Sequence, residues 1–165
     1  MNIVNATTCW CTIPSPIGDL FLAGDGERLT ALYMDSHDGW PKERGTWRRD
    51  DAPFKAVRMQ LNAYFTGRLQ VFDLPLAATG TAFQQTVWQA LAAIPYGVTI
   101  SYGELARRIG NPNASRAVGL ANGCNPLSIV VPCHRVIGAN GSLTGYGGGL
   151  ERKQWLLRHE GALLV

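Results

Sequence analysis

Three neighbouring side chains that could do chemistry together, Cys133, His134 and Arg135, follow the apolar run 129–132. Burial alone raises the pKa of a thiol and makes it inert, whereas an adjacent base or cation generates the nucleophilic thiolate. Because neighbouring side chains of an extended chain point opposite ways, we expect a water to bridge His134 and Cys133. Cysteine is more often a small core hydrophobe, so the triplet alone leaves both roles open for Cys133.

The bulk composition bounds the class of protein. The chain has 165 residues, of which 46% are hydrophobic, and this suits one compact unit or two small lobes. No apolar run reaches the roughly 18 residues of a membrane span, and residues 1–13 lack the features of a signal peptide. We therefore expect a cytoplasmic protein that does not enter a membrane. In that reducing compartment its four cysteines are expected as free thiols.

Charge is distributed unevenly along the chain. Residues 1–79 hold 8 Lys and Arg against 9 Asp and Glu, a net charge of −1, whereas residues 80–165 hold 7 against 3, a net charge of +4. A basic second half favours a polyanionic partner, although many basic domains bind none. We expect two lobes with this boundary, 1–79 and 80–165.

The first lobe has the pattern of a small sheet with a helix. Residues 9–13, 20–23 and 29–34 are short β-prone segments separated by turn residues, which predicts three strands. Residues 37–53 are polar and irregular. An apolar stripe predicts a helix over 54–66 that ends at Gly67. Residues 71–74 could form another strand, and residues 76–80 look like the linker.

The second lobe is mainly helical. Thr81 and Gln84 form a capping-box pattern that predicts a helix ending before Pro95. Short helices are predicted over 102–109 and 114–123, with an N-cap expected in the Asn-Pro-Asn turn at 111–113, and a last helix over 152–159. Residues 102–123 thus have the outline of a helix-turn-helix. The predicted fold class is α/β (α+β), with a helical, winged-helix-like second lobe.

The helix expected at 114–123 has a small and smooth surface. Ala, Ser and Gly occupy most of its positions, and Arg116 is its one long cation. A helix that reads base edges in the major groove usually carries long polar side chains. Small residues with one cation instead favour close approach to sugar–phosphate walls or to a narrow groove. Tight packing between two helices would explain the small residues equally well, so both interpretations stay open at this point.

The Pro-Cys-His-Arg-Val segment at 132–136 resembles the active-site motif of the O6-alkylguanine-DNA alkyltransferases, also called methylated-DNA–protein-cysteine methyltransferases. The likeness continues in FQQ at 83–85, VW at 87–88, IPYG at 94–97, SYG at 101–103, SRAVG at 115–119, NP at 125–126, TGYGGG at 144–149 and WLLRHEG at 155–161. Segments 14–18 and 61–67 are also similar to bacterial members. The resemblance covers the whole chain, strongly in the second lobe and loosely in the first. It implies a small antiparallel sheet flanked by helices in lobe 1–79, and DNA binding and alkyl transfer in lobe 80–165.

The resemblance implies a catalytic group built around one thiol. Cys133 matches the nucleophile, His134 the base that takes its proton through a water, and Glu160 the acid that holds the imidazole in its working tautomer. Asn125 matches a residue that ties the recognition helix to the active-site turn. Tyr102 matches the hydroxyl that donates a proton or hydrogen bond to the purine ring as the alkyl group leaves.

The resemblance also implies that the damaged nucleotide is rotated out of the duplex into a pocket, at a cost of a few kcal/mol. Arg116 matches the finger that fills the space left in the base stack. The other residues expected at DNA are Ser115, Ala117, Gly119 and Arg135. The pocket is expected to be lined by Val136, Tyr146, Gly147 and Gly148, with the carbonyls of Cys133 and Val136 accepting from the guanine amino group. Gly147 stands where relatives can carry a hydroxyl side chain. At this position we therefore expect the backbone, and no side chain, to contact the base.

The activity implied is DNA repair by stoichiometric transfer of the alkyl group from O6-methylguanine, and from O4-methylthymine, to Cys133. Turnover should be single, because a thioether is not undone by thiol–disulfide exchange with Cys124. No cofactor is expected. The partner is double-stranded DNA carrying alkylated guanine, bound by a monomer whose cooperativity along the duplex the sequence leaves open.

Three other interpretations were weighed. A structural zinc on Cys9, Cys11 and His37 is a poor match to the spacing of zinc sites, so we expect no metal and expect the two cysteines to alternate along a strand. A non-catalytic lesion sensor of the same fold would replace the nucleophile, yet Cys133 is present. A thiol hydrolase would use Cys133 and His134 on a small ester or amide and would have no need of Arg116.

Overall fold

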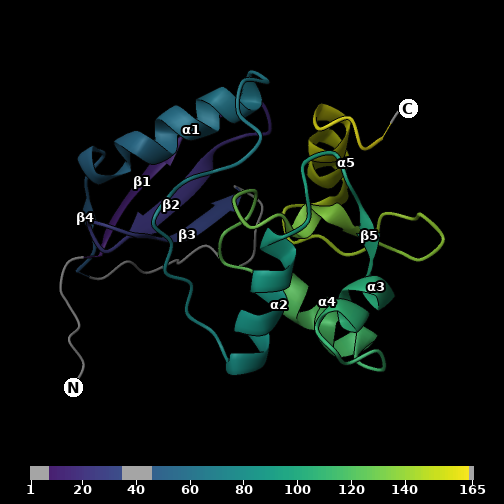
Figure 1. Ribbon diagram of the computed structural model, residues 1–165. Helices are drawn as coiled ribbons and strands as arrows, with labels where there is room; N and C mark the ends of the chain where they lie inside the picture. The colour runs from purple at the N-terminus through teal and green to yellow at the C-terminus, as the bar shows by residue number, and fades with distance from the viewer. Residues whose placement is uncertain (1–7, 35–45, 164–165) are drawn as a thin grey trace.

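Short β-prone segments at the start of the chain form the sheet of the first lobe. The computed structural model describes residues 8–34 and 46–163, and Figure 1 shows this sheet beside a helical lobe. The sheet contains the strands β1 (Cys9–Ile13), β2 (Leu20–Gly24) and β3 (Leu29–Met34). Each pairs antiparallel with the next one along the chain, as predicted. A two-residue strand, β4 (Arg48–Arg49), pairs parallel with β1, so the order is β3-β2-β1-β4. This strand falls in a segment that was expected to be irregular.

Alternation along β1 decides where its cysteines point. Cys9, Cys11 and Ile13 are buried while the residues between them are partly exposed, which is the period of a strand with one face in the core. The predicted alternation of the two cysteines is therefore confirmed. His37, the third member of the weighed metal set, lies outside the described residues.

A single helix covers one face of the sheet (Figure 1). The short helix η1 (Ala52–Phe54) leads into α1 (Lys55–Phe65), which buries Val57, Leu61 and Tyr64 on one stripe. The helix predicted over 54–66 is thus confirmed to within a residue at each end. Residues 71–74 do not form the strand that was considered for them. The chain instead passes beside β3 only at Leu76, which makes an isolated parallel bridge to Leu29.

The second lobe begins at the predicted cap. The Thr81 side chain accepts a hydrogen bond from the Gln84 backbone and the Gln84 side chain accepts one from Thr81, which opens α2 (Ala82–Ala92). The lobe continues with β5 (Ile100–Ser101), α3 (Tyr102–Arg108), α4 (Ser115–Gly123), η2 (Cys133–Arg135), β6 (Val136–Ile137) and α5 (Leu150–His159). Strands β5 and β6 form a separate parallel pair.

Helices α3 and α4 pack against each other across a short turn, an arrangement compatible with a helix-turn-helix. The N-cap of α4 is Ala114, which offers no side-chain cap, so the cap expected from the Asn-Pro-Asn turn is wrong. Helix α2 fixes the other side of α4, because the Trp88 indole donates a hydrogen bond to the Ala121 carbonyl at 2.9 Å. Among the described residues, none of the helices has the length and apolar character needed to cross a bilayer.

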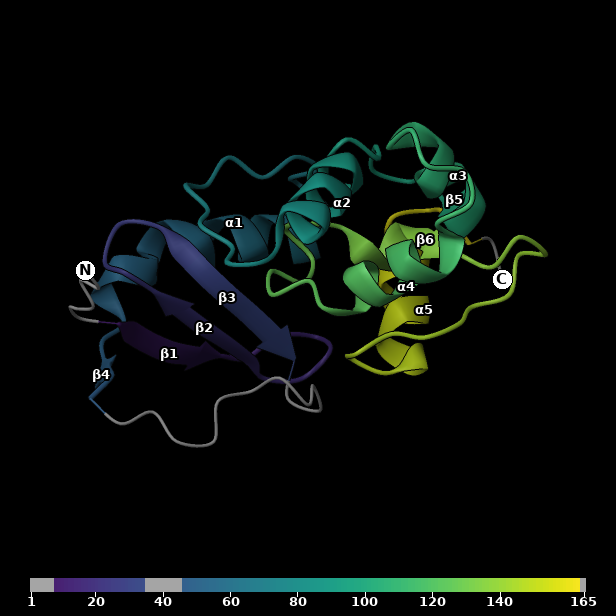
Figure 2. The same cartoon turned by 90° about the horizontal axis from the view of Figure 1, so that it is seen from below.

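The two lobes share backbone hydrogen bonds. Figure 2 shows β3 as the strand nearest to the helical lobe. There the Leu32 amide donates to the Pro126 carbonyl at 2.8 Å, and the Ser128 amide donates to the Leu32 carbonyl at 3.1 Å. The segment paired in this way leads directly into the turn that carries Cys133. The first lobe therefore supports the backbone of the reactive segment.

Candidate active site

The reactive cysteine lies on a tight turn, which differs from the extended chain expected from its β-branched neighbours. Ile129 has a positive φ of 74°, and it is the one non-glycine residue with positive φ in ranges 8–34 and 46–163. The Val131 amide donates to the Leu127 carbonyl at 2.9 Å, and the Cys133 amide donates to the Val131 carbonyl at 2.8 Å. Cys133 then opens the 3-10 turn η2. Because the chain is not extended here, its backbone does not impose the opposite orientation of neighbouring side chains that predicted a water between His134 and Cys133.

Two asparagines hold this turn. Asn125 is buried, donates to the Val131 carbonyl at 2.8 Å and accepts from the Leu127 amide at 3.0 Å. Asn122, on α4, donates to the Cys133 carbonyl at 3.4 Å, and its own carbonyl oxygen is buried without a partner among the described residues. The structure thus brings Asn125 to the place expected for it, between α4 and the active-site turn. Asn122 was not singled out from the sequence, because nothing distinguishes it there from other helix-end asparagines.

The sulfur of Cys133 is buried but not isolated from polar groups. The residue is only 5% exposed, and burial raises the pKa of its thiol. The Asn125 amide and the Lys153 ammonium lower that pKa and oppose the effect of burial. A thiol in such a setting needs a nearby base to become a thiolate.

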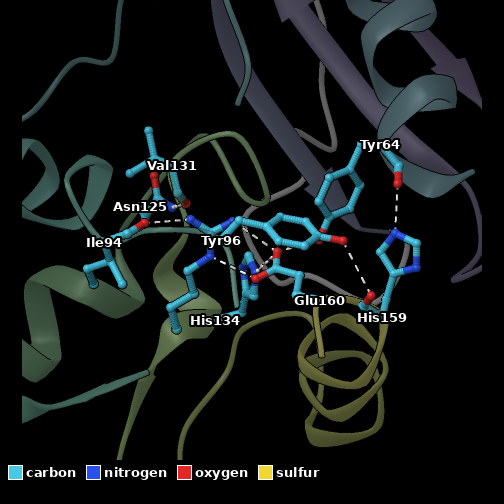
Figure 3. A network of polar contacts seen from close by, with 9 residues as sticks. Tyr64, Ile94, Tyr96, Asn125, Val131, His134, His159 and Glu160 are labelled. Atoms are coloured by element: carbon cyan, nitrogen blue, oxygen red, sulfur yellow. Dashed lines mark hydrogen bonds and ion pairs between the residues drawn. The ribbon is translucent and has the colours of Figure 1, made fainter. Parts of the chain in front are cut away.

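His134 has the features of that base. Its ring is fully buried, and its Nε2 lies 2.8 Å from the Oε2 of Glu160 (Figure 3). Burial lowers the pKa of His134 in spite of the raising effect of Glu160, so the neutral ring is favoured at neutral pH. With the proton on Nε2 facing the carboxylate, Nδ1 is left as an acceptor, and it is buried with no partner among the described residues. A free buried acceptor of this kind can take up a proton.

Glu160 collects hydrogen bonds from several side chains. The Arg135 guanidinium donates through Nε to Oε1 at 2.8 Å and through Nη2 to Oε2 at 3.0 Å, and the Tyr64 hydroxyl donates to Oε2 at 2.6 Å. Burial by itself raises the pKa of this carboxyl, but the donors outweigh burial and hold the pKa well below its usual range. Glu160 is therefore an anion at any physiological pH.

Arg135, which the sequence predicts at DNA, is bound inside the protein, and its contact with DNA stays a prediction. It is only 6% exposed, and its remaining donor, Nη1, binds the Ile94 carbonyl at 2.6 Å. All three guanidinium nitrogens are thus engaged inside the protein, and the ring of Tyr96 lies 5.8 Å from the guanidinium carbon. The physical reason for this burial is that a buried carboxylate requires a buried cation, and Arg135 is that cation.

A closed lid covers the thiol. Segment 145–148 lies over Cys133 and encloses with Asn122 and Asn125 a cavity of about 10 Å³, enough for about one water. The Tyr146 hydroxyl is buried there, and a Cβ on Gly148 would collide with the Met34 sulfur, so only glycine fits. The predicted pocket residues Tyr146, Gly147 and Gly148 therefore do gather at Cys133. Because a purine is much larger than a water, the lid must move before a base can reach the sulfur.

Lys153 is a site residue that the sequence analysis missed. It is fully buried on α5, and its Nζ donates to the Val136 carbonyl at 2.7 Å and to the Thr144 carbonyl at 3.0 Å. Burial lowers its pKa to about 8, against an opposing effect of Cys133. Lys153 thus connects the start of the lid to β6, the strand after the reactive turn. It also hydrogen-bonds the Val136 carbonyl, which was expected to accept from a guanine. Lys153 lies three and four positions before Leu156 and Leu157, on the buried face of α5. This helical spacing could have predicted from the sequence that Lys153 is buried.

The surface of α4 is as smooth as its sequence predicts. Ser115 and Gly119 are partly exposed, whereas Arg116 and Ala117 are exposed. A Cβ on Gly119 would lie 3.7 Å from the Tyr102 ring, so α4 passes close to this tyrosine. The Tyr102 hydroxyl donates to the Thr144 carbonyl at the start of the lid, at 3.3 Å. The exposed helix α4 with Arg116, the Tyr102 ring and the lid over the thiol are therefore adjacent.

The described residues contain no cluster of three or more His, Cys, Asp or Glu side chains that could hold a metal. The groups around Cys133 are hydrogen-bond donors, acceptors and one ion pair. They can generate a thiolate, but the nature of the group it would attack is not given by their geometry alone.

Two family models match the chain almost from end to end. The ribonuclease-like domain of 6-O-methylguanine DNA methyltransferase matches residues 9–78, and the DNA binding domain of the same family matches residues 82–162. The chain belongs to the 6-O-methylguanine DNA methyltransferase family. Curated methyltransferases agree: the methylated-DNA–protein-cysteine methyltransferase of Mycobacterium tuberculosis is 58% identical over 149 residues, which are 90% of each chain. That of Methanosarcina acetivorans is 54% identical over 90% of this chain and 95% of its own.

Solved structures of the methyltransferase family have the same fold. The Mycobacterium tuberculosis OGT crystallised in complex with DNA superposes with a TM-score of 0.87 at 55% identity, covering 95% of this chain and 94% of its own. The O6-methylguanine-DNA methyltransferase of Pyrococcus kodakaraensis superposes with a TM-score of 0.62 at 25% identity, covering 93% and 99%. The α/β fold class predicted from sequence is confirmed by these likenesses.

Proposed function

We propose that this methyltransferase repairs DNA by moving the methyl group of O6-methylguanine, and of O4-methylthymine, onto Cys133, once per molecule. The family membership supports DNA repair and a DNA partner. The observation that carries the assignment to Cys133 is a buried sulfur whose neighbour in the chain is a buried, neutral histidine with an Nδ1 that has no partner among the described residues. That histidine is held by a carboxylate that stays ionised.

The transfer is a displacement at carbon. His134 takes the thiol proton at Nδ1, directly or through a water, and Glu160 stabilises the resulting imidazolium. The thiolate attacks the methyl carbon, the carbon–oxygen bond breaks, and its electron pair passes to the guanine. The Tyr102 hydroxyl then supplies a proton or a hydrogen bond to the purine ring, so that a neutral guanine leaves. The thioether has no route back to a thiol, which makes the reaction stoichiometric.

The DNA side of the proposal uses α4 and the lid. Arg116 enters the base stack in place of the extruded nucleotide, while Ser115, Ala117 and Gly119 let the helix approach the sugar–phosphate backbone. The exposed position of Arg116 on a small-residue surface supports this role. The backbone of Gly147 and Gly148 and the Tyr146 ring close over the base. The protein acts as a monomer in this scheme.

The assignment is tested by counting methyl groups on the protein. We expect an excess of duplex containing O6-methylguanine to leave one methyl per chain, located on Cys133 by mass spectrometry. The Cys133→Ser variant should transfer nothing and still bind the duplex, whereas Cys124→Ser removes an exposed thiol and should react normally. More than one methyl per chain, or transfer by Cys133→Ser, refutes the proposal.

A second substrate separates chemistry from base extrusion. Free O6-benzylguanine does not have to be extruded from a duplex. Cys133 of the Arg116→Ala variant should therefore accept the benzyl group at the normal rate, whereas the same variant should react slowly with methylated duplex. Equal losses on both substrates would remove Arg116 from the extrusion step. A transient acyl species with a small ester, in place of the stable benzyl adduct, would favour the thiol hydrolase.

A further inference from the structure

The catalytic carboxylate is contacted from both lobes. Glu160 follows α5 in the second lobe, but one of its donors, Tyr64, belongs to α1 in the first lobe, 96 positions away in the chain. The Tyr64 hydroxyl lies 2.6 Å from Oε2, and Oε2 is also the oxygen bonded to the His134 ring. Figure 3 shows Glu160 between His134 and Tyr64. The first lobe thus reaches the group that orients the base.

Tyr64 is itself fixed on every side. Its ring is fully buried and packs edge-on against Phe65, Tyr96 and His159, with centroids 5.3, 6.2 and 5.1 Å away. The His159 ring meets the Tyr64 carbonyl at 2.7 Å through Nε2. A hydroxyl held this rigidly can set the position of a carboxylate, since neither partner has freedom to turn away.

We infer that Tyr64 is a positioning residue of the first lobe for alkyl transfer, whose hydroxyl holds Glu160 in place and limits the negative charge that Oε2 presents to His134. The inference rests on the proposed function, since it concerns the base of that reaction. It also gives lobe 1–79 a direct chemical contribution, in addition to the structural one expected from sequence.

The chemical consequence concerns the basicity of His134. Oε2 accepts from Tyr64, His134 and Arg135, and a carboxylate oxygen that accepts from several donors has less charge to offer each of them. Without the Tyr64 hydroxyl, Oε2 would attract the imidazolium more strongly and the ring would keep its proton to higher pH. Because only the neutral ring can deprotonate Cys133, the acidic side of the pH–rate profile should move to higher pH.

Several titratable and charged groups surround the pair, and the test alters only the hydroxyls of Tyr64 and Tyr96, one at a time. Those that face His134 are Glu160, Arg135 and Lys153. Those that face Glu160, besides His134, are Arg135, Tyr64, Tyr96 and Tyr146. The unaltered cations keep Glu160 ionised, so removal of one neutral donor changes how its charge is shared and leaves the charge itself in place.

The test is the rate of benzyl transfer from O6-benzylguanine to the full chain as a function of pH. For Tyr64→Phe we expect about a tenfold slower reaction near neutral pH. This is roughly the change in rate that corresponds to the loss of one hydrogen bond to a charged group. We also expect the acidic midpoint to move to higher pH. Tyr96→Phe is the matched control: its hydroxyl also faces Glu160, but among the described residues it hydrogen-bonds the His159 carbonyl, at 3.3 Å, and not the carboxylate. Its profile should be unchanged.

A double-mutant cycle shows whether the effect passes through the carboxylate. In a Glu160→Gln background, where reaction is followed over hours, adding Tyr64→Phe should slow the reaction no further. The inference is overturned by a Tyr64→Phe profile equal to the unaltered one, by equal losses in Tyr64→Phe and Tyr96→Phe, or by full additivity with Glu160→Gln. A Tyr64→Phe chain that unfolds below room temperature would assign the hydroxyl to folding and overturn it too. Absence of any adduct on the unaltered chain would instead refute the transfer reaction itself.

Discussion

Replacement of Glu160 by glutamine should destabilise the whole fold as well as the base. The carboxylate accepts from Arg135, His134 and Tyr64 and is completely buried, and the Arg135 side chain is only 7% exposed. The Glu160→Gln change leaves a buried guanidinium without its counter-charge and puts an amide donor where an acceptor is required. Breaking a buried pair in this way costs about 3–5 kcal/mol. For a chain of this size that corresponds to a fall of roughly 6–20 °C in Tm.

The assay is thermal unfolding followed by circular dichroism across a range of pH. The folded-state pKa of Glu160 lies below its unfolded value, so its contribution to stability is fully present above the unfolded pKa of about 4.3. It is lost as the pH falls from there toward the folded-state pKa. The difference in Tm between the two proteins should therefore be constant from about pH 8 to about pH 5.5 and should shrink below about pH 4.

Glu151→Gln is the matched control, because Glu151 lies exposed in the first turn of the same helix. Its loss should cost at most about 1 kcal/mol, the usual worth of an acidic side chain near a helix N-terminus. Two results would refute the reasoning. One is a Glu160→Gln Tm within about 2 °C of the unaltered value, equivalent to less than about 1 kcal/mol. The other is a difference that grows as the pH is lowered.

Three further substitutions test separate parts of the site and fold. Gly148→Ala should clash with Met34, lower the free energy of unfolding by about 1–3 kcal/mol in urea and slow benzylation by displacing the lid. Thr81→Ala should cost about 1 kcal/mol in the same urea experiment, because it removes the capping box, and should leave the benzylation rate unchanged. Lys153→Met should raise the pKa of Cys133, which the ammonium lowers, and so move the midpoint of the benzylation profile to higher pH.

Each of these expectations has an outcome that contradicts it. A Gly148→Ala protein with unaltered stability and rate would mean that the lid does not pack as described. A Thr81→Ala protein that reacts slowly would connect the start of α2 to the site. A Lys153→Met profile that is unchanged, or moved to lower pH, would remove the ammonium from the electrostatics of the thiol.

Local signals in the sequence predicted most of the elements. The strands β1 to β3 were found because alternation and turn residues bound them, and α2 because its capping box is encoded within four residues. The two-residue strand β4 has no such signal, since Arg48 and Arg49 are ordered by pairing with a strand far away in sequence. Residues 71–74 are β-prone but lack a strand partner, because the edge of β3 is occupied by Leu76 and Leu127.

The motif predicted which residues gather at the site, but not what each of them faces. His134 and Glu160 meet next to Cys133 in the chain, because the reactive turn and the last helix fold onto each other. Arg135 was expected at DNA from the resemblance, and its burial depends on a carboxylate 25 positions away that local pattern does not reveal. The turn before Cys133 was expected to be extended because its residues are β-branched, but backbone bonds within 127–133 override that propensity. Contacts between distant segments, such as Tyr64 with Glu160, leave no trace in local pattern.

The backbone bridge between β3 and Leu127 has a consequence for cleavage of the chain. A nick in the linker at 77–80 would cut the polypeptide but would leave Leu32 hydrogen-bonded to both Pro126 and Ser128. The two pieces should therefore co-purify. During reassembly, the free edge of β3 in the first piece should hydrogen-bond the segment before Cys133 in the second piece and order it. The cut would then separate the chain at 77–80, whereas the unit that folds cooperatively would still include both pieces. A split form of the protein could therefore be reconstituted from its halves.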